Sequence, residues 1–247
     1  MSKEHFKVFS DRNETSIDFD SKNEEFIKYI EGKINLINYE YLQIYIKKPK
    51  FAFENREFMV LIFRAIEYFI SATCLLRQRA YFKAGSILRM SIETAATAYH
   101  IKENNDALIN YKNNNYKSSN ATGFVTKKIA SFGRFWGDLS NFFVHINTFH
   151  GVISTAFEEN SEEYVYDSGR VNFGIKSEED DKKLEYPMII LSKTSLCVIY
   201  RLFELIFYKD VTYEGHKGKY QPEIDILKTG AMVETEIDKL LNELKQS

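Results

Sequence analysis

One short segment carries charged and titratable side chains at helical spacing. Residues 84–101, AGSILRMSIETAATAYHI, contain Arg89, Glu93 and His100. Separations of four and seven residues place these three side chains on one strip of a helix. Their neighbours are apolar, so we expect the strip to be partly buried, where charged groups need partners. The strip is either a structural Arg–Glu pair or the wall of a polar site.

A second segment contains a histidine that could transfer a proton. Asp138, Asn141, His145 and Thr148 form a polar strip opposite the apolar positions of the same expected helix. Lysine and glutamate are absent between residues 135 and 157, which predicts that this helix is enclosed. His145 would then be a general base for a nearby hydroxyl. The alternative is a buried histidine with one ring nitrogen donating and the other accepting a hydrogen bond.

These two segments resemble the HEPN superfamily (higher eukaryotes and prokaryotes nucleotide-binding), and more closely the uncharacterised bacterial all-helical families near it. Those families have an Arg-x3-Glu helix, here Arg89 and Glu93, followed by a helix with a Ser-x4-His signature, here Ser140 and His145. HEPN ribonucleases carry Arg, then Asn, Asp or His, then three residues and His. Asn141 and His145 match that motif, whereas Ser140 stands in place of its arginine.

The resemblance implies a helical bundle, frequent dimerisation, and a role in bacterial toxin–antitoxin or antiviral defence systems. It also implies metal-independent endoribonuclease activity, although inactive RNA-binding members exist. The expected catalytic residues are His145 as base or acid, Arg89 against the phosphate, Glu93 orienting Arg89, and Asn141 holding the substrate or the histidine. The further substrate-binding candidates are Ser140, Asp138, Arg134 and His100.

The serine at position 140 supports a competing hypothesis. A preorganised cation stabilises the charge that builds up on a phosphate under attack, and serine supplies none. Arg89 or Arg134 would have to replace it. Otherwise the chain is a catalytically inactive helical interaction module that dimerises or docks to a partner protein, with the same polar residues satisfying one another in the core.

Composition and motifs exclude several other functions. Lys and Arg number 33 against 35 Asp and Glu, a net charge of −2, unlike a strongly cationic nucleic-acid binder, although a local basic face remains compatible. His145 and His150 do not share a helix face, and no HExxH, Glu-x-x-His, GxGxxG or P-loop motif occurs. We therefore expect no metal and no cofactor.

The elements that would position these residues are helices. Apolar residues recurring every three or four positions predict helices at 23–48, 54–79, 81–103, 124–157, 187–209 and 222–245. We expect a short weak helix and a loop at 104–121, a break at Gly133 or Gly137, and prolines only at helix ends. Small Gly85 and Ala96 would let another helix approach closely.

The overall prediction is one all-α domain spanning 1–247, a bundle of five to seven helices. Its HEPN-like core covers about 55–210, with helices 23–48 and 222–245 packed on it. Alternation of period two in EYVYDSGRVNFGI predicts a β-hairpin near 163–175, followed by a solvated loop, KSEEDDKK.

The same sequence features indicate a cytoplasmic protein. The two cysteines lie in apolar stretches and form no disulfide framework, and the charged N-terminus lacks the apolar segment of a signal peptide. The most apolar run, 187–208, is interrupted by Lys193, Arg201 and Glu204, which favours a buried core helix over a membrane span. The expected partners are RNA or a nucleotide, and a second copy or another protein.

Overall fold

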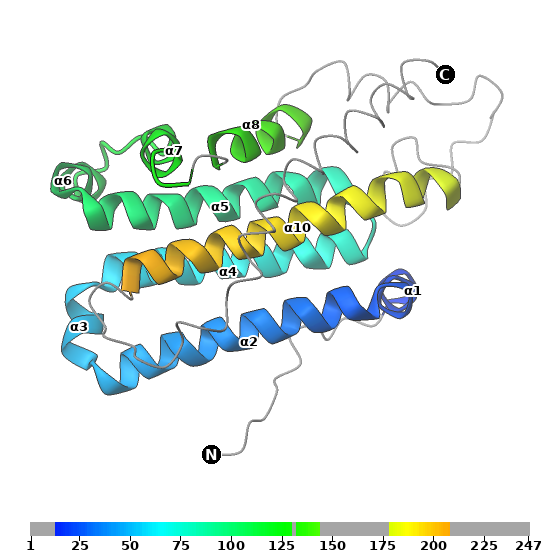
Figure 1. Cartoon of the computed structure of the whole chain (residues 1–247), viewed down its shortest axis with the longest axis horizontal. Helices are drawn as coiled ribbons and strands as arrows, with labels where there is room; N and C mark the ends of the chain where they lie inside the picture. Colours follow the sequence, from blue (N-terminus) through cyan, green and yellow to red (C-terminus); the bar gives the residue numbers. More distant parts are fainter. Residues whose placement is uncertain (1–12, 130–131, 144–177, 208–247) are drawn as a thin grey trace.

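The computed structural model describes residues 13–129, 132–143 and 178–207. These ranges form nine α-helices and no strand, which confirms the all-α class for the part described (Figure 1). The number of helices exceeds the predicted five to seven, because short helices flank the long ones. The bounds are α1 Glu14–Lys22, α2 Glu24–Lys47, α3 Pro49–Glu54, α4 Arg56–Arg77, α5 Tyr81–Glu103, α6 Asn105–Lys112, α7 Ser119–Thr126, α8 Phe132–Phe143 and α10 Glu178–Phe207.

Helix α5 lies at the centre of the bundle. It pairs most extensively with α4, and it also packs against α10 on one side and α7 and α8 on another. In Figure 1 the helices α6, α7 and α8 lie above α5, and α2 lies on the far side of α4 and α10. Every residue from Ala95 to Ile101 is buried. The alanines there let neighbouring helices approach, and the polar residues of α5 consequently need partners from those helices.

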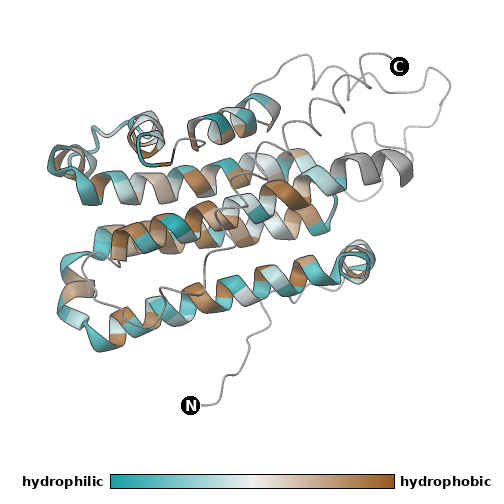
Figure 2. Cartoon of the chain, viewed as in Figure 1, coloured by the Kyte–Doolittle hydropathy of each residue, from teal (hydrophilic) through white to brown (hydrophobic). Residues whose placement is uncertain are grey.

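The apolar residues that recur along α2 predicted the position of this long helix correctly. On α2 the buried residues Phe26, Ile30, Ile34, Ile37 and Ile44 recur at the spacings of three, four and seven residues that are typical of an amphipathic helix. Tyr41, which lies between Ile37 and Ile44 on the same face, is half-buried. The hydropathy colouring in Figure 2 shows apolar and polar positions interleaved along α2, as an amphipathic helix requires.

Two local predictions were wrong. Helix α10 begins at Glu178, so residues 178–183 of the expected loop KSEEDDKK are helical, and Pro187 lies inside the helix. Acidic residues in a first turn stabilise the positive end of the helix dipole, which explains why EEDDKK extends the helix. The break after α7 begins at 127–129, ahead of Gly133 and Gly137, both of which are helical.

Other predictions lie outside the described residues. These are the hairpin near 163–175, the helix 222–245, and the segment that contains His145 and Thr148. Among the described helices, α4 alone is long and apolar enough to cross a membrane. Nearly half of its apolar window, 44%, is buried inside the bundle, and the core helix of a soluble protein has the same length and composition.

Candidate functional site

Arg89 and Glu93 lie together on the side of α5 that faces α8. The Arg89 guanidinium is 3.2 Å from a carboxylate oxygen of Glu93, and the two side chains are 21% and 16% exposed. Their i,i+4 spacing on a continuous helix explains the pairing. Partial exposure leaves one edge of this ion pair accessible from solvent.

Two residues of α8 complete the arrangement. Arg89 Nε donates a hydrogen bond to Ser140 Oγ at 2.6 Å, and the guanidinium carbon lies 4.8 Å from the centre of the Trp136 ring. Trp136 Nε1 lies 3.4 Å from a Glu93 oxygen, a long contact. We call Arg89, Glu93, Trp136 and Ser140 the α5–α8 site. Cation–π contact and charged hydrogen bonds together fix the plane of the guanidinium.

The structure separates Asn141 from the residues with which it was grouped. Trp136, Ser140 and Phe143 are spaced by four and three residues, and this face of α8 meets α5. Asn141 is exposed, so the prediction that this helix is enclosed was wrong at that position. Uncharged polar residues such as asparagine are also mostly exposed to water. The absence of lysine and glutamate from a helix therefore does not indicate that the helix is buried.

The remaining predicted residues of this segment are spread over different surroundings. Asp138 is half-buried and Arg134 is exposed. Of the two arginines considered as substitutes for the missing one, it is Arg89 that hydrogen-bonds Ser140. His145 lies outside the described residues.

His100 lies further along the same strip of α5, in a separate aromatic environment. Its ring stacks on Phe124 at 4.5 Å between centroids, and its Nδ1 lies 2.8 Å from the Tyr116 hydroxyl. Burial lowers the pKa of His100. Burial also raises the pKa of Tyr116 to about 12, with the negative charge of Glu93 adding to the effect and a hydrogen bond with Thr97 opposing it. A neutral imidazole and a protonated phenol therefore face each other at neutral pH.

His100 is expected to make stability depend on pH. Its folded-state pKa lies below the unfolded value of about 6.5, so the unfolded chain binds the extra proton first. The contribution of His100 to the free energy of unfolding is fully present at pH values above the unfolded-state pKa. It is lost as the pH falls toward the folded-state pKa. Urea unfolding of the parent and of His100→Gln at pH 7 and pH 5 tests this: the parent should lose more stability than the variant. Equal losses would contradict a buried neutral histidine.

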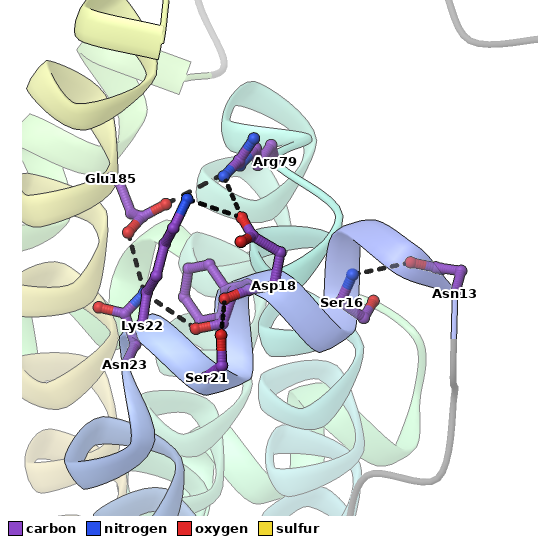
Figure 3. Close-up of polar contacts among 9 residues, drawn as sticks. Asn13, Ser16, Asp18, Ser21, Lys22, Asn23, Arg79 and Glu185 are labelled. Atoms are coloured by element: carbon purple, nitrogen blue, oxygen red, sulfur yellow. Dashed lines mark hydrogen bonds and ion pairs between the residues drawn. The ribbon is translucent and has the colours of Figure 1, made fainter.

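A second polar cluster ties α1 to the rest of the bundle, and Figure 3 shows the part of it around Asp18, Arg79 and Glu185. Arg77, only 1% exposed, binds both carboxylate oxygens of Asp20 through Nε and a terminal nitrogen, at 2.7 and 2.6 Å. Arg79 contacts Asp18 at 2.8 Å and reaches toward Glu185 of α10 at 3.9 Å. We call Asp18, Asp20, Arg77, Arg79 and Glu185 the α1 ion-pair cluster.

Local structure explains how the α1 ion-pair cluster forms. Asn13 caps α1 by accepting a hydrogen bond from the Ser16 amide at 2.8 Å, and α1 places Asp18 and Asp20 on either side of buried Phe19. The Lys22 ammonium, and then the Arg79 guanidinium, hold the pKa of Asp18 below its usual value. Each acidic group thus has basic partners, which is typical of a structural connection.

Sequence reasoning missed the α1 ion-pair cluster and Trp136. The pairs in the cluster join residues 57 and 61 positions apart, and no local spacing reveals such contacts. The one signal in the sequence was Arg77 at the C-terminal end of an apolar helix. That signal is ambiguous, because a cation is favoured at the C-terminal end of any helix.

The α5–α8 site can hold an anion or a flat aromatic group. A guanidinium binds phosphate or carboxylate, and an indole stacks on a base. No three His, Cys, Asp or Glu side chains converge on a metal-binding geometry within 13–129, 132–143 and 178–207. A scan against protein-family models finds no match, and searches of the curated proteins and of the solved structures find none.

Proposed function

We propose that the α5–α8 site binds RNA or a nucleotide, in a HEPN-like protein of bacterial defence or toxin type. Arg89 would contact a phosphate and Trp136 a base, while Glu93 and Ser140 hold the arginine in place. In the catalytic form of this proposal the protein is a metal-independent endoribonuclease. His145 would then take the proton of the attacking 2′-hydroxyl, and Arg89 would stabilise the charge that develops on the phosphate.

The observation that supports this proposal is the hydrogen bond between Arg89 and Ser140. In the motif that the sequence resembles, an arginine occupies the place of Ser140. Here the guanidinium of Arg89 lies 2.6 Å (Nε to Oγ) from that serine. An arginine from the neighbouring helix thus brings a positive charge to the position where the motif has one. Arg89 is also 21% exposed, so part of its side chain can be reached from solvent.

One observation favours the alternative, a catalytically inactive interaction module. Glu93 and Ser140 already bind the guanidinium, so part of its hydrogen-bonding capacity is used inside the chain. A buried or half-buried arginine with such partners can serve packing alone. The two functions differ in whether the parent protein binds or cleaves RNA.

Trp136 offers a direct readout, because it is the single tryptophan of the chain. Titration of the parent with a short unlabelled single-stranded RNA in EDTA should change its fluorescence, since a bound base would contact the indole. Arg89→Gln should weaken binding by roughly tenfold, the effect of losing about 1.4 kcal/mol of a charged phosphate contact. Cleavage in the same buffer, lost in His145→Ala, would identify a ribonuclease.

Arg201→Gln is the matched control. Arg201 is exposed on α10 and pairs with Glu204 at 2.9 Å, so this change also removes an arginine from an intrahelical ion pair. It should leave RNA affinity unchanged. Circular dichroism verifies that each variant is folded. Absence of both binding and cleavage by the parent would reject the RNA proposal and leave the interaction module.

A further inference from the structure

A group of exposed apolar side chains covers one end of the bundle. On α2 they follow one another at spacings of three and four residues, and they continue onto α3 and α4. We call this group the α2 apolar patch; it consists of Tyr39, Leu42, Tyr45, Ile46, Phe53 and Phe63. Ile46 is 65% and Phe53 69% exposed. Large apolar groups gathered in this way are typical of a surface that another segment covers.

One ring contact joins α2 to α4 beside the α2 apolar patch. Tyr41, which is half-buried, lies 6.1 Å from Phe63 between ring centroids and so joins α2 to α4. Tyr45 follows Tyr41 by four residues on the same face of α2, and burial, then Tyr45, raises the pKa of Tyr41.

The described chain ends beside this patch. Phe207, the last residue of α10, lies 6.3 Å from Phe51 of α3 between ring centroids. Phe51 is two residues from Phe53, so Phe207, after which residues 208–247 follow in the sequence, lies at the end of the bundle where the patch lies. The 14 residues from 208 to 221 span up to about 46 Å when extended, more than the length of about 36 Å that α2 has.

The sequence of the C-terminal segment matches the α2 apolar patch in two respects. Residues 222–245 have apolar residues at helical spacing, namely Ile224, Leu227, Ala231, Ile237, Leu240 and Leu244. The segment also holds six acidic residues against three lysines, a net charge of −3. The patch is bordered by exposed basic residues, Lys47, Lys48, Lys50 and Arg56.

We propose that residues 222–245 of the same chain pack on the α2 apolar patch as an amphipathic helix. The apolar stripe of the segment would cover the exposed rings and aliphatic groups, and its carboxylates would lie near the basic border. This inference is independent of the RNA proposal, because the α2 apolar patch and the α5–α8 site share no residue.

Hydrogen exchange of the full chain, measured by mass spectrometry, tests the proposal. In the parent, the amides of 222–245 should exchange slowly. In Leu42→Glu/Ile46→Glu they should exchange roughly tenfold faster or more, because two charges replace apolar contacts. Ile109→Glu is the matched control, since Ile109 is an exposed isoleucine on α6 and lies outside the patch. Exchange of the α4–α5 pair should be the same in all three proteins.

Three results would overturn the proposal. One is rapid exchange of 222–245 in the parent, and another is exchange there that the double variant leaves unchanged. The third is a parent protein that is a dimer, together with a double variant that is a monomer and has unchanged exchange in 222–245. A second copy of the chain would then be what covers the α2 apolar patch. Light scattering on the same samples gives the oligomeric state. Both substitutions are at exposed positions, so the bundle itself should remain folded.

Discussion

Replacing Asp20 with alanine is expected to lower the free energy of unfolding by about 3 kcal/mol. The change leaves Arg77, a charged side chain that is 1% exposed, without the carboxylate that binds two of its nitrogens. Asp20 itself is 34% exposed, but Arg77 is buried, so removing the carboxylate leaves the positive charge of Arg77 in a poorly solvated place. Urea unfolding at pH 7, followed by circular dichroism, measures the loss.

Asp18→Ala is the matched control for this prediction. Asp18 is an acidic residue of the same helix with the same kind of partners, Lys22 and Arg79, but it and Lys22 are 43% and 45% exposed. Solvent screens such pairs, so its removal should change stability far less. Equal effects of the two substitutions would show that burial of Arg77 does not set the strength of the α1 ion-pair cluster.

Replacing Gly85 with alanine should destabilise the protein by about 1 to 2 kcal/mol. A Cβ atom at Gly85 would overlap the ring of Phe143, the last residue of α8. The neighbouring Ser86 hydroxyl donates a hydrogen bond to the Phe143 carbonyl at 2.6 Å, so α8 cannot move away without losing that contact. The free-energy cost of this overlap should exceed the free energy gained from the higher helix propensity of alanine.

The single tryptophan also reports on this substitution. Because Trp136 lies on α8, displacement of that helix should expose its indole and shift its fluorescence to longer wavelength. Gly32→Ala is the control: a Cβ atom there meets nothing within 4 Å, so alanine in the middle of α2 should stabilise by up to about 1 kcal/mol. A Gly85→Ala protein as stable as the parent, with unchanged fluorescence, would contradict the close packing of α5 and α8.

The long helices could be predicted from sequence, because burial repeats along them. The expected bounds 81–103 for α5 coincide with those observed, and the expected 23–48 for α2 differs by one residue at each end. Helix α1 has nine residues and a single buried apolar side chain, Phe19, which is too short a pattern to indicate a period.

The composition of the candidate site was predictable only in part. Arg89 and Glu93 were paired correctly, since their contact lies within one helix. The partner from α8 depends on the rotation of that helix, and one residue corresponds to about 100°. Ser140 and Asn141 are adjacent polar residues, yet one is buried against α5 and the other is exposed. Hydrophobicity alone does not distinguish between them.

The three-residue connection between α4 and α5 affects how the bundle assembles. Arg79 adopts a left-handed conformation with φ of 58°, and the chain reverses within Gln78, Arg79 and Ala80. Contacts between α4 and α5 therefore close a small loop, whereas α10 joins them only after residues 104–177. This pair, which needs only a short loop to close, carries Arg77, Arg89 and Glu93, and its connection carries Arg79. Local folding of α4 and α5 therefore sets the relative placement of these three arginines and Glu93, whereas Asp18, Asp20 and Glu185 reach the α1 ion-pair cluster from distant segments of the chain.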